Sequence, residues 1–305
     1  MTNLTAPRFT NETAAREHLE ATRWPDGPHC PHCGTFNRAS RIEGKSARPG
    51  LWFCNACRKQ FSATVGTLFE SSKVPLHKWL LAVHLVNSSK KGMSSHQLGR
   101  MLGVTYKTAW FMAHRIREAM TNPNAGPIGG ENKVVEADET YVGGKAKNRA
   151  YRKPAPKKAV MTLVERDGEA RSYHVANVNA KTLRPIMVKV ASRQSHLMTD
   201  ESTIYPKIGD EYAGHSTVNH SAKEYVREGG FVHTNTAENF FSIFKRGIYG
   251  VYHHVSEAHM ARYLAEFDFR YNTRKITDAE RATLALKGIE GKRLTYRRID
   301  GTANA

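Results

Sequence analysis

All four cysteines of this chain stand in two short pairs, and their spacing restricts the fold more than any other feature. The pairs are Cys30-Pro-His-Cys33 and Cys54-Asn-Ala-Cys57, with 20 residues between them. Each pair can form a short turn that presents two sulfur atoms, and two such turns can surround one tetrahedral Zn²⁺. The spacing therefore predicts a zinc ribbon over residues 25–70, with the four thiolates as ligands of one structural ion.

Two other arrangements of the cysteines stay open. The thiols could form two disulfides, or His29 or His32 could replace one sulfur ligand. A duplicated pair at this spacing is typical of a metal site, and we therefore expect both histidines to be unligated. Residues 1–24 form an N-terminal segment without the charged start and apolar core of an export signal. These features predict a protein of the reducing cell interior.

The segment 71–121 carries a helical pattern. Apolar side chains recur there at helical spacing, at Leu76, Trp79, Leu80, Val83 and Val86. Ser94 can cap a short helix that ends at Gly103, and Thr105 can cap a second helix that runs to Met120. Two helices with a tight turn are typical of a helix-turn-helix, although an ordinary helical hairpin leaves the same pattern.

The chain is strongly basic, with 46 Lys and Arg residues against 28 Asp and Glu residues and a net charge of +18. Such an excess favours a polyanionic partner, because basic side chains release counterions from phosphates on binding. In a helix-turn-helix the second helix would enter the major groove of DNA, and Tyr106, Lys107 and Arg115 would be open to contact it. No stretch approaches the roughly 20 apolar residues of a transmembrane helix, so we expect no membrane partner.

Residues 122–132 contain two prolines and three glycines and predict a linker. Residues 133–280 then show the order strand, hairpin, helix, strand, helix. The expected elements are a strand at 133–144, a hairpin at 158–175, and helices at 180–192, from Asn235 and at 256–271, with a strand at 196–200. Residues 145–158 hold seven basic residues and predict a loop that contacts phosphates, or a solvated charge run. This α/β pattern suits a ribonuclease-H-like mixed-sheet core, and residues 281–305 read as a basic C-terminal tail.

Three acidic residues of this core occur in settings that suit a metal-bound carboxylate. Asp138 lies inside the first strand, Asp200 ends the strand at 196–200, and Glu238 lies in the first turn of a helix. Hard cations such as Mg²⁺ and Mn²⁺ prefer oxygen ligands, and three carboxylates could hold two of them for phosphodiester chemistry. Asp138 and Asp200 can share an ion only if their strands are neighbours in the sheet.

Other acids compete with the first two. Glu136 and Glu139 lie on the same strand as Asp138, and one member of the Asp138-Glu139 pair could simply face solvent. Glu201 follows Asp200, and either could cap the turn after the strand. The pattern alone does not decide between these acids.

The third position has an alternative of its own. Glu238 could complete a capping box with Asn235 as the cap, and the neighbouring Asn239 could instead supply an amide oxygen to the metal. Lys245 lies two helical turns beyond Glu238 on the same face, where it could contact a DNA phosphate beside the metal, and Arg246 could share this contact. The apolar residues expected to pack this helix on the sheet are Phe240, Phe241 and Phe244.

With these motifs in this order, the chain resembles the bacterial insertion-sequence transposases of the IS1595 family, in the ISXO2-like group, from about Pro25 to Asn272. The resemblance rests on the cysteine ribbon, the helix pair, Asp138-Glu-Thr-Tyr-Val-Gly-Gly-Lys145, Thr199-Asp200 and His233-Thr-Asn-Thr-Ala-Glu-Asn-Phe-Phe-Ser-Ile-Phe-Lys-Arg246. It implies a DDE-type catalytic core of ribonuclease-H-like fold, in which Asp138 and Asp200 are the first two metal ligands. The third position varies among such relatives, so Glu238 and Asn239 both stay open, and Lys245 matches their basic residue two helical turns on.

The resemblance implies a DNA transposase that binds the terminal inverted repeats of a mobile element and catalyses Mg²⁺-dependent strand cleavage and strand transfer. Joining two ends needs at least two active sites, so a homo-oligomer on DNA is expected. Such a bacterial enzyme works in the cytoplasm, at the nucleoid. Two alternatives are a metal-dependent nuclease without strand transfer, which would share every residue named, and a non-catalytic DNA-binding regulator, in which the acids would have decayed.

Overall fold

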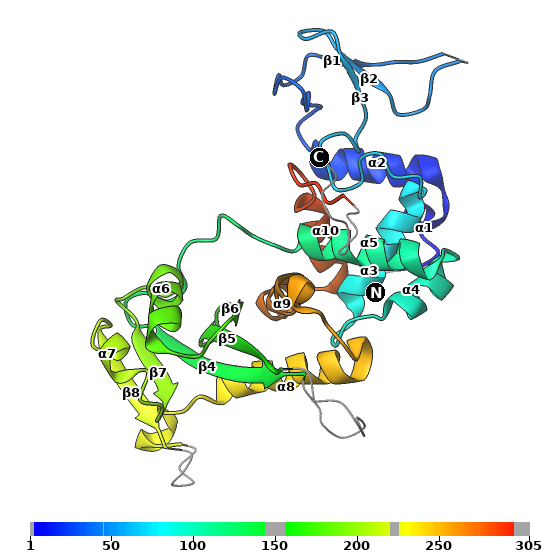
Figure 1. The fold of residues 1–305 in the computed structure, drawn as a ribbon. Helices are drawn as coiled ribbons and strands as arrows, with labels where there is room; N and C mark the ends of the chain where they lie inside the picture. Colours follow the sequence, from blue (N-terminus) through cyan, green and yellow to red (C-terminus); the bar gives the residue numbers. More distant parts are fainter. Residues whose placement is uncertain (1–2, 45, 144–155, 220–225, 296–305) are drawn as a thin grey trace, which may run out of the picture. The chain divides into compact units, whose positions relative to one another are not determined.

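A computed structural model describes residues 3–44, 46–143, 156–219 and 226–295 (Figure 1). The chain divides into two compact units. Met1–Thr121 together with Ile276–Ala305 forms unit 1, and Asn122–Lys275 forms unit 2. Most of the basic run predicted to meet phosphates, residues 145–158, lies outside the described residues.

Three short strands form the ribbon of unit 1. β1 (Ala39–Arg41), β2 (Trp52–Cys54) and β3 (Gln60–Phe61) pair in this order, and both pairings are antiparallel. Strands of this length bury little surface of their own, so aromatic side chains from outside the ribbon support them. Trp24 packs edge-on against both Trp52 and Phe61, with 5.8 Å between the ring centroids in each pair.

The rest of unit 1 is helical. Its helices are α1 (Pro7–Thr10), α2 (Glu12–Arg23), α3 (Leu76–Ser88), α4 (Ser95–Leu102), α5 (Tyr106–Ala119) and α10 (Asp278–Lys287). The Ser94 hydroxyl accepts from the Gln97 amide and caps α4, and the Thr105 hydroxyl accepts from the Thr108 amide and caps α5. Between the two helices Gly103 has φ of 60°, a left-handed conformation that favours glycine. The predicted pair of helices, its caps and its turn are therefore present.

The C-terminal part of the chain differs from the predicted tail. Unit 2 ends at Lys275, and α10 packs against α2, α3 and α5 of unit 1. Thr277 and Glu280 form a capping box at its start. The buried side chains of its inner face are Ala282, Ala285 and Leu286. Because this face has a single large apolar residue, the sequence shows only a weak helical pattern there.

A five-stranded mixed sheet forms the centre of unit 2. Its strands are β4 (Val134–Val142), β5 (Lys158–Glu165), β6 (Ala170–Val175), β7 (His196–Asp200) and β8 (Gly214–Val218). The order across the sheet is β6-β5-β4-β7-β8. The pairs β4–β5 and β5–β6 are antiparallel, whereas β4–β7 and β7–β8 are parallel. The predicted hairpin is confirmed as β5 and β6, and the strands that carry Asp138 and Asp200 are neighbours.

Helices cover both faces of this sheet (Figure 1). They are α6 (Ala180–Val190), α7 (Pro206–Gly209), α8 (Asn235–Gly247), a π-helical turn (Ile248–Tyr252) and α9 (Glu257–Asn272). Met161 and Leu163 of β5 belong to the core beneath α6, and Val160 and Val164 belong to the core beneath α8 and α9. A strand buried on both faces reads as a continuous apolar run, as β5 does. Among the described residues, no helix combines the length and apolar character needed to cross a bilayer.

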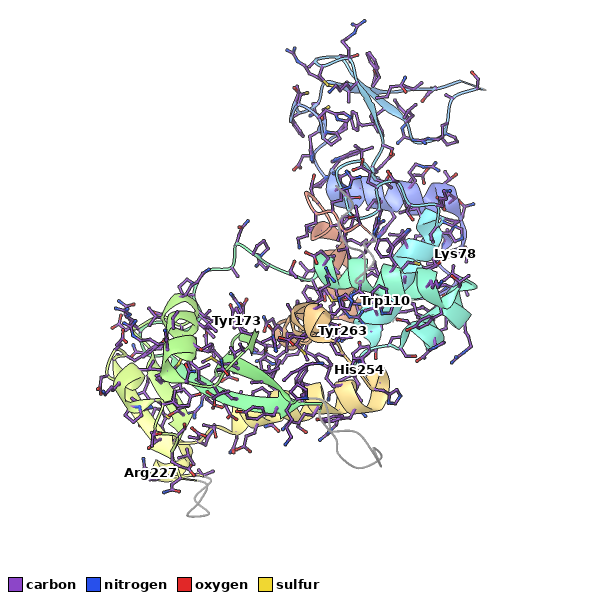
Figure 2. All side chains as sticks on the ribbon, viewed as in Figure 1. Lys78, Trp110, Tyr173, Arg227, His254 and Tyr263 are labelled. Carbon is purple, nitrogen blue, oxygen red and sulfur yellow. The ribbon has the colours of Figure 1, made fainter. Side chains whose placement is uncertain are left out.

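α8 packs on the sheet through its aromatic side chains, as predicted. Phe240, Phe241 and Phe244 are buried in the core that α8 shares with α9. Tyr263 of α9, labelled in Figure 2, packs edge-on against Tyr252 with 4.7 Å between ring centroids. This apolar base holds α8 along the face of the sheet that also carries Asp138.

Candidate functional site

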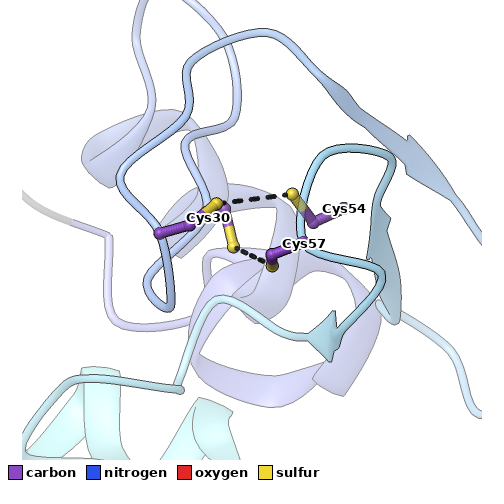
Figure 3. A group of neighbouring side chains, drawn as sticks. Cys30, Cys54 and Cys57 are labelled. Carbon is purple, nitrogen blue, oxygen red and sulfur yellow. Dashed lines mark hydrogen bonds between the residues drawn. The ribbon is translucent and has the colours of Figure 1, made fainter.

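The four cysteine sulfurs of unit 1 lie together, as predicted. Cys30 Sγ is 3.6 Å from Cys57 Sγ, and Cys33 Sγ is 3.7 Å from Cys54 Sγ. All four lie within 4.8 Å of one another, and Figure 3 shows the sulfur atoms turned toward each other. Thiolates that bind one Zn²⁺ at about 2.3 Å in a tetrahedron stand about 3.8 Å apart. The cluster fits a zinc ion, and the thiols are not joined in disulfides.

The histidines beside the first cysteine pair have other partners. His29 Nε2 is 2.9 Å from Glu290 Oε1, and His32 Nε2 is 3.3 Å from the carbonyl oxygen of Gln60. Neither ring belongs to the sulfur cluster. The four-sulfur set is therefore complete without them.

In unit 2 the carboxylates of Asp138 and Asp200 meet. The parallel pairing of β4 with β7 places Glu136 opposite Met198. If this register is continued by two residues along both strands, Asp138 lies opposite Asp200. Ligand oxygens of Asp138, Glu139 and Asp200 all lie within 4.8 Å of one another. Strand pairing thus brings together two residues with 61 others between them in the chain.

The two aspartates also share one face of the sheet. Val142 of β4 belongs to the core beneath α8 and α9, and Val134 of β4 packs with Met198 of β7. Side chains alternate along a strand. Asp138 therefore points to the same face as Val134 and Val142, and Asp200 to the same face as Met198. A shared cation is possible only with this arrangement.

Backbone amides orient both aspartates. The Glu139 amide donates to Asp138 Oδ1 at 2.7 Å, and the Ser202 amide donates to Asp200 Oδ1 at 3.1 Å. Of the two acids that could start the turn after β7, Asp200 makes this contact, whereas Glu201 is exposed. Neutral amide donors fix the carboxylates without cancelling their charge, so both remain suited to a cation.

Glu139 joins the aspartates, which strand alternation alone does not predict. Tyr205 Oη, on the α6 side of the sheet, donates to Glu139 Oε1. Burial raises the pKa of Glu139 to about 7, and the charges of Asp138 and Asp200 add to the rise. The hydrogen bond from Tyr205 acts in the opposite direction and lowers this pKa. Acids that disfavour one another's ionisation are the setting that a bound divalent cation relieves. Both members of the Asp138-Glu139 pair are half-buried, so neither simply faces solvent.

Glu136 has a different position from these acids. Its carboxylate is buried and accepts hydrogen bonds from the amides of Thr236 and Ala237, at 2.8 and 3.0 Å. Arg166 Nε donates to it at 2.6 Å. Glu136 is therefore bound to the first turn of α8 and is not part of the carboxylate group around Asp138.

Glu238 and Asn239 are exposed residues of the same first turn. The alternative capping box does not form, because Asn235 is the first helical residue rather than the cap, and its amide donates to His233 Nδ1 at 3.3 Å. Among the described residues, Glu238 is not in the group of ligand atoms within 4.8 Å. The third metal ligand, Glu238 or Asn239, stays a prediction.

The two basic residues predicted beside this site lie near the end of α8. Lys245 is half-buried and Arg246 is exposed. Arg246 Nη2 donates to Ser242 Oγ at 2.9 Å, one turn back toward Glu238. Both cations therefore lie along the helix that carries Glu238, and their contact with DNA stays a prediction.

The predicted DNA contacts of unit 1 divide into two kinds. Tyr106 and Lys107 are exposed at the start of α5. Arg115, expected to be open, is half-buried: its guanidinium lies 4.6 Å from the centroid of the Phe111 ring, and Nε donates to the Leu294 carbonyl at 3.2 Å. The C-terminal segment returns to cover it, and no local pattern reveals that return.

The donor atoms of the two clusters suit different metals. Thiolates are soft ligands, and four of them around one point leave no open position, which is typical of a structural zinc site. Carboxylate oxygens are hard ligands, and a group of three leaves positions for water or substrate around a cation such as Mg²⁺. Unit 1 therefore offers donor atoms that suit a structural zinc ion, and unit 2 offers donor atoms that suit a hard divalent cation.

Known sequence families match both regions. The ISXO2-like transposase domain matches residues 129–272, and the transposase zinc-ribbon domain matches residues 10–60. A similar protein of Halobacterium salinarum, described as an uncharacterized protein in transposable element ISH50, is 30% identical over 280 residues. The match covers 86% of this chain and 91% of that protein. The first matched range contains the carboxylate group, and the second contains the four cysteines.

Proposed function

Because this chain belongs to the ISXO2-like transposases of the IS1595 family, we propose that it binds the terminal inverted repeats of an insertion sequence and catalyses metal-dependent DNA strand cleavage and strand transfer. The observation that carries the proposal is the meeting of Asp138 and Asp200 on one face of the sheet. A regulator without catalysis has no need of such a group.

The fold supports a ribonuclease-H-like core for this DDE-type chemistry. Three antiparallel strands, β6, β5 and β4, continue into the parallel strands β7 and β8. The first acid lies on the central strand and the second at the end of its parallel neighbour, with α8 on the face they share. That combination of topology and acid positions is what a ribonuclease-H-like reading of the sequence requires.

The residues present fit divalent cations at this site. When bound, Mg²⁺ or Mn²⁺ stabilises negative charge on phosphodiester oxygens, and we expect two ions. Asp138 and Asp200 would hold them with carboxylate oxygens, and Glu238 or Asn239 of α8 would supply the third ligand. Glu139 places a further carboxyl group beside the pair.

Basic residues would orient the DNA. Lys245 and Arg246 lie two turns beyond Glu238 on α8, at a distance that lets them bind phosphates flanking the reacting one. In unit 1, the exposed Tyr106 and Lys107 open the second helix of the proposed helix-turn-helix. The zinc ribbon and this helix pair would together recognise the terminal repeats, with the net charge of +18 supplying general affinity for phosphates.

Strand transfer of two element ends needs two active sites, and each chain supplies one. We therefore propose a homo-oligomer assembled on DNA. Its place of action would be the bacterial nucleoid, in the cytoplasm.

The test measures strand cleavage of a DNA duplex that carries the terminal repeat. The sequence of this repeat is taken from the DNA that flanks the gene. Wild-type protein should nick the repeat end only with Mg²⁺ or Mn²⁺. Asp138→Asn should abolish nicking and retain repeat binding in a gel-shift assay. Asp210→Asn, an exposed aspartate of the same unit, is the matched control and should cleave normally. Nicking by Asp138→Asn would refute the site.

A second arm separates a transposase from a nuclease. A repeat duplex that already ends in the cleaved 3′-hydroxyl is incubated with a supercoiled target plasmid. Covalent joining of the end to the plasmid supports strand transfer. Cleavage of the intact repeat without any joining of the pre-cut end would identify a nuclease.

A further inference from the structure

The buried carboxylate of Glu136 connects the strand of Asp138 to the helix of Glu238. We propose that Glu136 is a positioning residue, which sets the first turn of α8 and thereby places the third metal ligand against Asp138 and Asp200. This inference rests on the proposed function, in which α8 supplies that ligand. Glu136 itself is not in the metal-ligand group.

Glu136 accepts hydrogen bonds directly from the first turn of α8. Its Oε2 accepts from the amides of Thr236 at 2.8 Å and Ala237 at 3.0 Å, and its Oε1 accepts from Thr236 Oγ at 2.8 Å. The N-cap residue, Thr234, makes no capping bond of its own. The first amides of a helix need an outside acceptor, and a carboxylate also suits the positive end of the helix dipole. Glu136 of β4 therefore caps the N-terminus of α8.

Arg166 fixes the other side of the same carboxylate. Its Nε donates to Glu136 Oε1 at 2.6 Å, its Nη1 to the Phe231 carbonyl at 2.7 Å, and its Nη2 to the His233 carbonyl at 2.8 Å. The segment that leads into α8 is thus tied to the sheet by one guanidinium. Charge-assisted hydrogen bonds of this kind are shorter and stronger than neutral ones.

The same segment is also tied to the edge strand. Arg227, labelled in Figure 2, donates through Nη2 to the Thr217 carbonyl of β8 at 3.2 Å. Its backbone exchanges hydrogen bonds with Val232 at 3.0 and 3.1 Å. Hydrogen bonds therefore hold residues 226–234 in place as they lead into α8, and Glu136 binds the first turn of the helix itself.

The consequence for the site follows from chain positions. Glu136 and Asp138 are two residues apart on β4 and point to the same face, about 7 Å apart along the strand. Glu238 directly follows Ala237, whose amide Glu136 binds. A shift of this first turn would therefore move Glu238 and its neighbour relative to the two aspartates.

The experiment compares Glu136→Gln with Glu165→Gln in the full chain. Glu165 is a suitable control because it is a largely buried carboxylate of the same sheet that accepts the Gly129 amide at 3.0 Å, without contacting α8. Mn²⁺ affinity is measured by the electron paramagnetic resonance signal of the free ion, and cleavage of repeat DNA is titrated with Mg²⁺. Thermal unfolding of each variant is recorded in parallel.

Glu136→Gln keeps one acceptor oxygen but places an amide group among donors. We expect its Mn²⁺ dissociation constant and its half-saturating Mg²⁺ concentration to rise by about tenfold to a hundredfold, as for other residues that orient metal ligands. Excess Mg²⁺ should restore cleavage, and repeat binding should be unchanged. Glu165→Gln should leave the metal requirement unchanged, whatever its effect on stability.

A purely structural role gives a different result. In that case Glu136→Gln lowers the melting temperature, and it lowers the cleavage rate by the same factor at every metal concentration. That result overturns the proposal. If Glu136→Gln does not fold, Thr236→Val, which removes only the hydroxyl contact, should raise the Mn²⁺ dissociation constant by a smaller factor, and an unchanged constant counts against the proposal. Failure of the proposed function is recognised separately, by nicking in Asp138→Asn or by a wild-type protein that binds Mn²⁺ without cleaving.

Discussion

The cysteine cluster of unit 1 and the carboxylate cluster of unit 2 are assembled in different ways. The four sulfurs come from two turns within Cys30–Cys57, and no long-range pairing is needed to bring them together. The carboxylates of Asp138 and Asp200 come from strands that meet only when the sheet has formed. We therefore expect one site to depend on its metal for local folding, and the other to depend on a fold that exists before the metal binds.

This difference decides what loss of a ligand does to stability. A structural zinc ion supplies folding free energy, so each thiolate stabilises its unit. Clustered carboxylates oppose one another until a cation arrives, so each one destabilises the metal-free unit. The predictions below test this contrast, from the largest expected effect to the smallest.

Loss of zinc should be the most damaging change. In Cys54→Ser, or after chelation, the ribbon should unfold, because binding of structural zinc is worth about 10–16 kcal/mol in small zinc modules. Zinc content, terminal-repeat binding and protease sensitivity of residues 28–61 measure this loss. His32→Ala, outside the sulfur cluster, should keep its zinc. A Cys54→Ser protein with a protease-resistant ribbon would break the comparison.

Asp200→Asn should act in the opposite direction on stability. Cleavage should fall by roughly 10²–10³-fold, the size expected when one preorganised electrostatic group is removed. In chelator at mildly alkaline pH, however, unit 2 should gain about 0.5–2 kcal/mol, as is common when a functional site loses its like charges. Asparagine can still accept the Ser202 amide. Urea unfolding of the wild-type and Asp200→Asn proteins without metal gives the sign of the change in unfolding free energy. Destabilisation by Asp200→Asn would contradict the contrast between the two clusters.

A variant of Asp268 tests how burial of a carboxylate affects the stability of unit 2 without involving the metal site. Asp268 of α9 is half-buried, and its carboxylate accepts hydrogen bonds from the amide and the hydroxyl of Ser172; desolvation of the carboxylate raises its pKa to about 7. The folded state therefore holds its proton while the unfolded chain releases it near the usual value of about 3.9, so stability falls as pH rises from about 4 to about 7. Asp268→Asn should remove this part of the slope, by a few kcal/mol, in urea unfolding across that range. Cleavage should stay metal-dependent, and an unchanged slope would show that Asp268 does not cause it.

The smallest expected effects are those of the basic residues on α5. Lys107→Ala should weaken repeat binding by less than about tenfold and reduce the salt dependence by about one ion, because one phosphate contact is lost. Arg115→Ala should instead lower the stability of unit 1, since its guanidinium packs on Phe111 and binds the Leu294 carbonyl. Fluorescence anisotropy at several salt concentrations distinguishes the two. A larger loss of the salt slope in Arg115→Ala would show that it reaches DNA.

The features predicted well from the sequence are those set by local chemistry. The cysteine turns, the helix caps at Ser94 and Thr105 and the hairpin at 158–175 depend on a few adjacent residues, and all are present. The pairing of the strands that bear Asp138 and Asp200 could be stated only as a requirement, because nothing local specifies which strands become neighbours.

The features that escaped prediction depend on distant parts of the chain. Glu139 joins the aspartates because Tyr205 orients it from the other face of the sheet. Arg115 is covered because residues near Leu294 return to unit 1. Glu136 looks like a rival of Asp138 in sequence, yet its carboxylate caps a helix a hundred residues later. No periodicity or motif carries such information.

The return of α10 to unit 1 makes unit 2 an insertion between two parts of the first unit. On the ribosome, the whole of unit 2 is synthesised before unit 1 receives its last helix. A gene copy interrupted anywhere within unit 2 loses α10 as well, and so produces a protein whose unit 1 lacks part of its packing. Complete packing of unit 1 in this way depends on a reading frame that stays intact through the whole of unit 2.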